Sequence, residues 1–150
     1  MVRDVVRSWI LPQRPPLARC LLVVVAGMTV DRQELGKDGE NLAVRELTAQ
    51  GYAIVEQRYR TRFGEIDIIA HDGDTLVFVE VRRKSGDDCG TAAESVTPAK
   101  QRRVIRMAVD YLTRYDLYDK VPVRFDVVAI DDGPDGQPHL TLFKDAFACS

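Results

Sequence analysis

The stretch from Gly64 to Lys84, GEIDIIAHDGDTLVFVEVRRK, decides the fold of this chain. Two apolar runs flank an Asp-Gly pair at 72–73, and Asp-Gly between alternating apolar runs is a strong signal for a β-hairpin. A turn centred on this pair predicts three cross-strand pairs on one face: Ile69 with Leu76, Asp67 with Phe78 and Glu65 with Glu80. The stretch therefore predicts two antiparallel strands in a defined register.

Acidic side chains gather on one face of that hairpin. Because side chains alternate between the two faces of a strand, Glu65, Asp67, Glu80 and Arg82 share a face. The predicted register makes Asp67 and Glu80 diagonal neighbours, about 7–8 Å apart at the backbone, and sets Glu65 directly opposite Glu80. Like charges across a ladder destabilise it unless a positive charge lies between them. A divalent cation is the obvious candidate for that charge.

The composition is that of a single globular domain. A chain of 150 residues, 45% of them hydrophobic, is long enough to bury an ordinary core. The three cysteines (Cys20, Cys89 and Cys149) have no C-x-x-C spacing, so neither a disulfide framework nor a zinc site is expected. This usage favours a reducing compartment and predicts a cytoplasmic protein without a membrane partner.

Basic residues cluster locally, although the net charge of −2 gives no overall attraction for nucleic acid. The segment from Arg82 to Arg106 holds seven basic residues against three acidic ones, and Arg58, Arg60 and Arg62 form a second cluster before the hairpin. Such clusters are typical of a nucleic-acid-binding surface, and equally of the solvated face of a helix and a loop. Charge alone does not separate the two interpretations.

Residues 1–30 differ from the rest of the chain. They hold four arginines and one aspartate, and end in an uncharged run of 11 residues from Cys20 to Val30. That run is shorter than the roughly 20 residues that cross a bilayer. A secretory signal peptide and a true start of translation at Met28 are two explanations. We favour a third, a poorly ordered or dispensable extension.

The remaining segments predict an α/β domain over residues 31–150. Helical periodicity covers Glu34–Gln50, and a second helix opens at Thr97-Pro98, where Thr suits the N-cap and Pro the first helical position. Strands are predicted at 52–59, 123–130 and 139–143, in addition to the hairpin. The order α-β-β-β-α-β-β predicts a mixed β-sheet with flanking helices.

Both helices would bring polar side chains to the acidic face of the hairpin. Mg²⁺ and Mn²⁺ prefer oxygen ligands, so Asp67 and Glu80 would hold such an ion, with Glu40 of the first helix as a further ligand or as the group that positions water. The alternative for Glu40 is a favourable charge in the first turn of a helix. Arg82 would stabilise charge that develops on a phosphoryl group.

Gln101 lies in the first turn of the second helix, within its apolar stripe. An amide that points toward a core needs a hydrogen-bond partner. That partner is either a backbone carbonyl or a carboxylate or water of the site.

Four segments resemble the YraN-like family of small bacterial proteins, which is related to archaeal Holliday-junction resolvases and to restriction-endonuclease-like nucleases. They are GKDGENLAVREL (36–47), the run from Gly51 to Lys84, ESVTPAKQRR (94–103) and VRFDVVAI (123–130). The resemblance runs in consistent order over roughly residues 35–147. It implies a restriction-endonuclease-like core and Mg²⁺-dependent endonuclease activity.

The resemblance also implies roles for individual residues. The catalytic set would be Glu40, Asp67, Glu80, Arg82 and Gln101, with Asp67, Glu80 and Glu40 as metal ligands. The E-x-K motif falls on Glu80-Val81-Arg82, where Arg replaces Lys. Arg stays charged and cannot act as a base, so this position can stabilise charge but cannot deprotonate water. Nucleic acid would contact seven basic residues: Arg60, Arg62, Arg83, Lys84, Lys100, Arg102 and Arg103.

Three hypotheses follow from the sequence. The leading one is a metal-dependent endonuclease that acts on branched or structured DNA in repair or recombination, as a monomer or a homodimer. The alternative is a non-catalytic nucleic-acid-binding module that retains the nuclease fold. A third is a structural acidic cluster in a protein that binds another protein, but an acidic face without a neutralising partner costs stability.

The first prediction concerns the extension. If residues 1–30 contribute nothing to the core, a protein that starts at Met28 should melt at the same temperature as the full chain in a thermal denaturation scan. A loss of several degrees would contradict this and would mean that the extension packs on the domain.

Overall fold

The computed structural model of the protein describes residues 32–84, 96–133 and 135–148. The extension predicted at residues 1–30 lies outside them. In chain order the elements are α2 (Arg32–Ala49), β1 (Ala53–Thr61), β2 (Gly64–Asp72), β3 (Thr75–Lys84), α3 (Pro98–Arg114), β4 (Val123–Asp132) and β5 (Pro138–Phe143). The predicted α/β class and the order α-β-β-β-α-β-β are confirmed.

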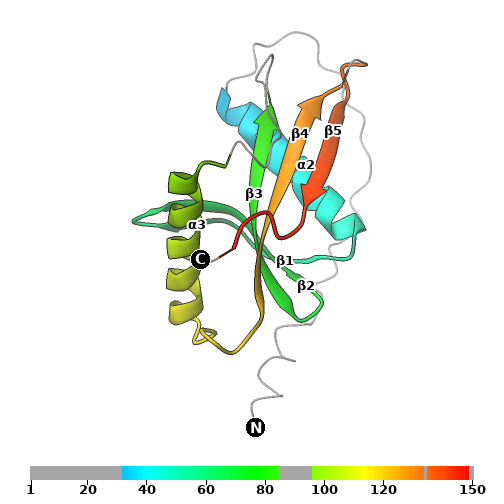
Figure 1. Ribbon diagram of the computed structural model, residues 1–150. Coiled ribbons are helices and arrows are strands. Elements are labelled where there is room, and N and C mark those ends of the chain that lie inside the picture. The colour runs from blue at the N-terminus through cyan, green and yellow to red at the C-terminus, as the bar shows by residue number, and fades with distance from the viewer. Residues whose placement is uncertain (1–31, 85–95, 134, 149–150) are drawn as a thin grey trace.

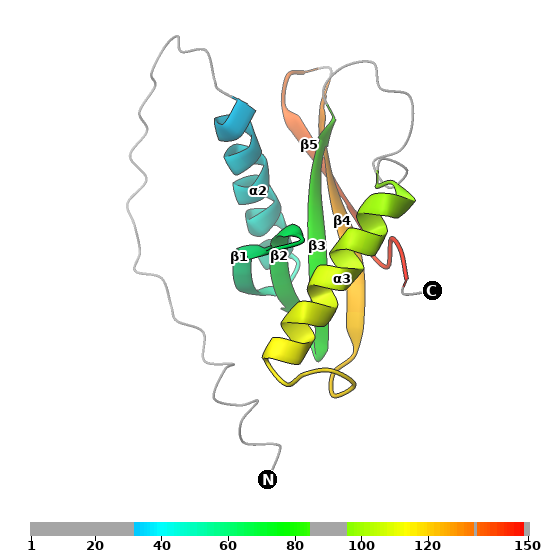
Figure 2. The same cartoon turned by 90° about the vertical axis from the view of Figure 1, so that its left-hand side faces the viewer.

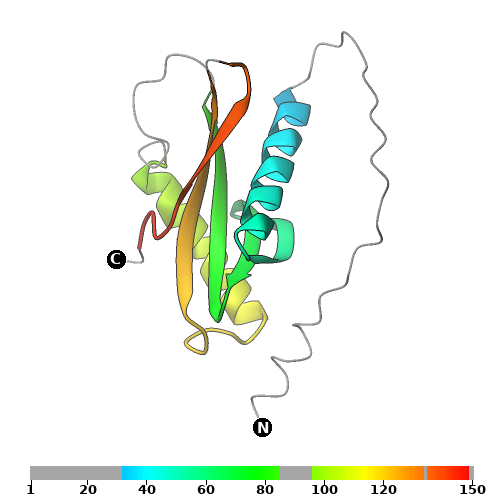
Figure 3. The same ribbon diagram turned by 90° about the vertical axis from the view of Figure 1, so that its right-hand side faces the viewer.

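The five strands form one mixed sheet in the order β1-β2-β3-β4-β5. Neighbouring strands are antiparallel except β3 and β4, which run parallel. Parallel neighbours need a crossover connection, and α3 lies within it. Figure 1 shows this arrangement, and Figures 2 and 3 show α2 and α3 on opposite sides of the sheet.

Each helix covers its own hydrophobic core. Thr97 caps α3 by accepting a hydrogen bond from the Lys100 N–H, and Pro98 occupies the first turn, as the sequence predicts. The cluster under α3 contains Phe78 and Tyr111, and the cluster under α2 contains Leu47. The sheet is therefore buried on both faces, which explains why β4 is buried continuously from Phe125 to Ile130.

The register of the β2–β3 hairpin differs from the prediction by two residues. Ile69 pairs with Phe78, and Asp72 pairs with Thr75, so the turn consists of Gly73 and Asp74. Gly73 has a φ of 60°, and glycine at the first central position is what a tight hairpin turn requires. A shift by two keeps every side chain on its face. Asp67 and Glu80 follow directly after the last pair of this ladder, Ile68 with Val79, whereas the prediction had made them diagonal neighbours.

The backbone of β1 departs from ordinary strand geometry at Arg58. The ladder pairs Gln57 with Ile68 and Tyr59 with Ile66. Arg58 has a φ of 55°, an uncommon backbone conformation for a residue with a side chain. Beyond this point both strands turn toward α3, where the Tyr59 hydroxyl donates a 3.1 Å hydrogen bond to Asp110. Figure 1 shows the hairpin crossing to that helix.

Within the described segments, no helix is both long enough and apolar enough to span a bilayer.

The second prediction tests the turn. Gly73→Ala should lower the free energy of unfolding by about 1–2 kcal/mol, because left-handed backbone costs a residue with a Cβ about this much. Urea denaturation measures the change. Asp74→Ala at the next turn position, where φ is not positive, is the matched control and should have a clearly smaller effect. An unaffected Gly73→Ala variant would argue against a turn at Gly73.

Candidate functional site

One pocket gathers the charged residues that the sequence singled out. It has a volume of about 230 Å³ and receives residues from α2, β2, β3 and α3. Its lining consists of Gly39, Glu40, Asp67, Glu80, Val81, Arg82, Arg83 and Lys100. Glu40, Asp67, Glu80 and Arg82, four of the five predicted catalytic residues, therefore meet in one place.

Gly39 allows α2 to lie close to the sheet at this point. A Cβ added at Gly39 would stand 3.3 Å from the Ile130 side chain, which is tighter than most contacts of that kind. The next residue along the helix is Glu40, which lines the pocket. The glycine thus sets the distance from which Glu40 reaches the strands.

Asp67 lies where β2 separates from β3, and its side chain connects the two strands. Its Oδ2 accepts a 2.7 Å hydrogen bond from the backbone N–H of Val81. Burial, and next the neighbouring charge of Glu80, raise the pKa of Asp67 to about 7, although the Val81 N–H and Lys100 oppose this shift. The Asp67 carboxyl is therefore hydrogen-bonded to β3 in surroundings that disfavour its negative charge.

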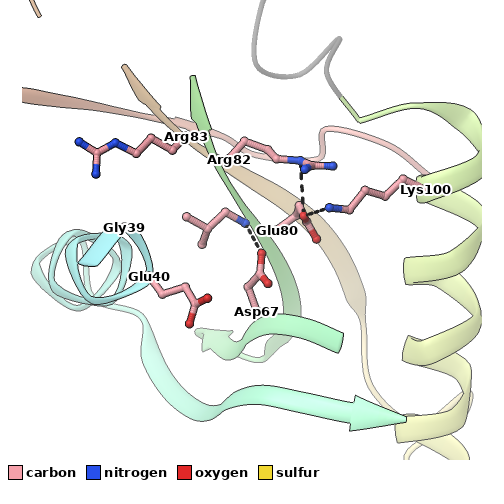
Figure 4. A pocket seen from close by; sticks show the side chains of 8 residues that line it. Gly39, Glu40, Asp67, Glu80, Arg82, Arg83 and Lys100 are labelled. Atoms are coloured by element: carbon pink, nitrogen blue, oxygen red, sulfur yellow. Dashed lines mark hydrogen bonds and ion pairs between the residues drawn. The ribbon is translucent and has the colours of Figure 1, made fainter. Parts of the chain in front are cut away.

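Glu80 is buried, with 4% of its surface exposed, and two cations approach it. Lys100 Nζ from α3 forms an ion pair and hydrogen bond with Oε1, and Arg82 Nε lies 3.4 Å from the same oxygen. Arg82 Nε is itself buried and has no hydrogen-bond partner among the described residues. Figure 4 shows both cations directed at Glu80. A buried carboxylate requires such compensation, because desolvating it alone costs several kcal/mol.

Glu40 is held by Arg58, a residue that the predicted site did not include. The Arg58 guanidinium donates two hydrogen bonds to the Glu40 carboxylate, at 2.6 and 2.9 Å. The pKa of Arg58 is raised, chiefly by this contact. The sequence placed Arg58 in a basic cluster, but nothing in its spacing pointed to a partner 18 residues away on a helix.

Three carboxylates lie close enough to share a cation. Glu40, Glu65 and Asp67 each offer an oxygen atom within 4.8 Å of the others. The predicted ligands were Asp67, Glu80 and Glu40, so the structure adds Glu65 to the group and leaves Glu80 beside Lys100. Glu65 shares the hairpin face with Asp67 in the sequence pattern, which was the available signal. Carboxylate oxygens in this number fit a hard divalent cation such as Mg²⁺ or Mn²⁺.

Gln101 does not join these residues. Its side-chain amide donates a 2.9 Å hydrogen bond to the carbonyl of Val96, just before the helix. The first of the two expected partners, a backbone carbonyl, is therefore the one observed. The catalytic role predicted for Gln101 stays a prediction.

The basic residues predicted to contact nucleic acid fall into two groups. Arg60, Arg83 and Lys100 are paired with acidic residues: Glu65, Asp132 and Glu80 respectively. In contrast, Arg102 and Arg103 are exposed on α3, and Arg62 lies at the tip of the β1–β2 hairpin.

At that tip Phe63 joins the hairpin to α3. The guanidinium carbons of Arg62 and Arg106 lie 4.7 and 3.8 Å from the centre of the Phe63 ring. Arg62 at the hairpin tip and Arg102, Arg103 and Arg106 on the adjoining helix α3 are all exposed. We call these four residues the arginine ridge. The side chain of Lys84 lies outside the described residues.

Comparison with known proteins identifies relatives over most of the described domain. The sequence model of Uncharacterised protein family UPF0102 matches residues 39–130, which include every residue that lines the pocket. A UPF0102 protein of Symbiobacterium thermophilum is 48% identical over 115 residues, covering 77% of this chain and 97% of that protein. A UPF0102 protein of Herminiimonas arsenicoxydans is 51% identical over 102 residues, covering 67% of this chain and 79% of that protein.

The third prediction uses the pKa of Asp67. Because its pKa in the folded protein lies above the ordinary value of 3.8, protonation of Asp67 stabilises the fold, and this contribution is lost as the pH rises from about 4 through about 7. In EDTA, the free energy of unfolding of Asp67→Asn should therefore vary less with pH over this window than that of the wild type. Urea denaturation at several pH values measures the difference.

Asp119→Asn is the control for this measurement. Asp119 is exposed and has a φ of 58°, a conformation that Asn tolerates, and it lies outside the pocket. This variant should follow the pH profile of the wild type. Identical profiles for Asp67→Asn and the wild type would contradict the assignment.

Proposed function

The chain belongs to the uncharacterised protein family UPF0102, and from that premise we propose that it is a metal-dependent endonuclease that hydrolyses phosphodiester bonds in branched or structured DNA. The observation that carries the proposal is that carboxylates and cations meet in one pocket. Glu80 is buried beside Lys100 and Arg82, and Asp67 lines the same pocket. The relation to nucleases rests on the resemblance of the sequence, since the family description names no activity.

The donor set fits the metal that this activity requires. Glu40 and Asp67 would hold Mg²⁺ or Mn²⁺, with Glu65 as their neighbour and Glu80 as the further ligand that the resemblance implies. When bound, such an ion neutralises charge on a phosphoryl oxygen and makes water a stronger nucleophile. Burial and the charge of Glu80 raise the pKa of Asp67, and a cation bound beside this carboxylate would lower it.

The protein's own residues have separate tasks in the proposed reaction. Hydrolysis forms a bond from a water oxygen to phosphorus and breaks the bond from phosphorus to one bridging oxygen. The bridging oxygen takes one proton of the water and leaves as a hydroxyl group, and the other proton of the water passes to solvent. Negative charge builds up on the phosphoryl oxygens along the way, and Arg82 stabilises it from the pocket wall.

The arginine ridge would hold the DNA. Its four guanidinium groups lie outside the pocket, and none of them is paired with a carboxylate in the described part of the chain. Contacts of this type bind phosphates without reading the sequence, which suits an enzyme that recognises the shape of DNA. We expect this activity in the cytoplasm, in a monomer or a homodimer.

One observation favours a second function. Arg82 stands at the lysine position of the E-x-K motif, and arginine cannot accept a proton from water. The alternative is therefore a module that binds structured DNA through the same surface without cleaving it. Both functions require DNA binding, but only the first yields cleaved DNA.

The fourth prediction tests cleavage. Wild-type protein should cut a labelled four-way junction or a flap in Mg²⁺ or Mn²⁺, should cut linear duplex less, and should cut nothing in EDTA. Asp67→Asn should lose cleavage by on the order of 10²-fold or more, because the site loses a charged ligand, and should keep most of its affinity for DNA. Electrophoresis of the products and fluorescence anisotropy measure the two quantities.

Asp119→Asn again provides the matched control and should cleave like the wild type. Binding without cleavage in either metal would support the alternative function. Neither binding nor cleavage would reject both.

A further inference from the structure

Lys100 reaches the site from a different element than the motif residues. The N-cap at Thr97 fixes the first turn of α3 and orients the Lys100 backbone. From there the side chain extends to Glu80 on β3, 20 residues earlier in the chain. Figure 4 shows the ammonium group at the end of this extended side chain, facing the Glu80 carboxylate from the helix side.

Lys100 is the closer of the two cations that share Glu80 Oε1. Arg82 Nε lies 3.4 Å from this oxygen and makes no hydrogen bond within the described chain, whereas Lys100 Nζ hydrogen-bonds to it. An ammonium group has three donors in a compact volume. One of these donors bonds to Glu80. Lys100, which carries the other two donors, lines the same pocket as Asp67 and Arg82.

We propose that Lys100, which lies on α3, takes the place of the lysine in an E-x-K motif, where glutamate and lysine lie on the same strand. Its ammonium group then contacts the scissile phosphate during cleavage. The inference rests on the proposed function and deepens it by assigning a further catalytic residue. Arg82 occupies the motif position but carries a larger planar group. Lys100 restores the compact cation at Glu80 by a different route through the fold.

A purely structural role for Lys100 predicts different behaviour. As a counter-ion of Glu80, Lys100 would matter for stability, and any cation that fits beside Glu80 would replace it. As a phosphate contact, it would also displace a counterion from the DNA. One such contact contributes about one unit to the slope of log affinity against log salt concentration.

The experiment compares Lys100→Ala, Lys100→Arg, Arg82→Lys and the double variant Arg82→Lys/Lys100→Ala with the wild type. Junction and flap DNA are cut in Mg²⁺, and DNA binding is measured in Ca²⁺ at several salt concentrations. Lys120→Ala is the matched control, because Lys120 is exposed and pairs with Asp116 away from the pocket. Melting temperatures identify variants that have lost the fold.

Lys100→Ala should lower the cleavage rate by on the order of 10²–10³-fold and reduce the salt slope by about one unit. Lys100→Arg should lose much of the rate although it keeps the charge. The double variant should regain at least about tenfold over Lys100→Ala, because a lysine returns to the motif position, where a compact cation can again reach the phosphate. This rescue remains decisive if Lys100→Ala alone is unstable. Lys120→Ala should match the wild type.

Undiminished cleavage by Lys100→Ala, with an unchanged salt slope, would overturn the inference. So would a double variant that folds but shows no recovery. Failure of the proposed function would look different, since the wild type itself would then cut none of the substrates. In that case the salt slope alone decides whether Lys100 contacts a phosphate.

Discussion

The burial of the Glu80 carboxylate is the constraint on which the rest of the site depends. A carboxylate with 4% exposure is stable only if positive charge meets it, and the cations must come from residues that the fold brings within reach. Arg82 is supplied by the same strand. Lys100 reaches Glu80 only if the first turn of α3 lies beside this part of β3. The charge of Glu80 is therefore balanced only when the helix is in this position.

The charges of the pocket are separated across its width. Carboxylates from α2 and the β1–β2 hairpin gather on one side, where Arg58 holds Glu40, and the cations Arg82 and Lys100 stand on the other with Glu80. A phosphodiester group carries negative charge and needs positive charge around it. Under the proposed function, the acidic side would hold a cation and the basic side would meet a phosphate, as metal-assisted hydrolysis requires.

Signals from neighbouring residues in the sequence predicted the helices and strands, but they did not predict contacts between residues that lie far apart in the chain. The alternation around Asp67 and Glu80 and the Thr97-Pro98 start of α3 depend on neighbouring residues, so both could be read directly. The register was wrong by two because a turn at Asp72-Gly73 and one at Gly73-Asp74 both suit this stretch, and the structure has the latter. The contacts Arg58–Glu40 and Lys100–Glu80 depend on how β1 bends and where α3 lies, and no spacing encodes either.

The parallel pairing of β3 with β4 has a kinetic consequence. Antiparallel hairpins join strands that follow one another in the chain, whereas the pairing of β3 with β4 closes the longer loop that contains α3, which costs more chain entropy. The ion pair between Glu80 and Lys100 joins β3 to the helix within this connection. A partly folded chain with only its hairpins formed would still lack the assembled pocket, because Glu40 and Lys100 come from the two helices.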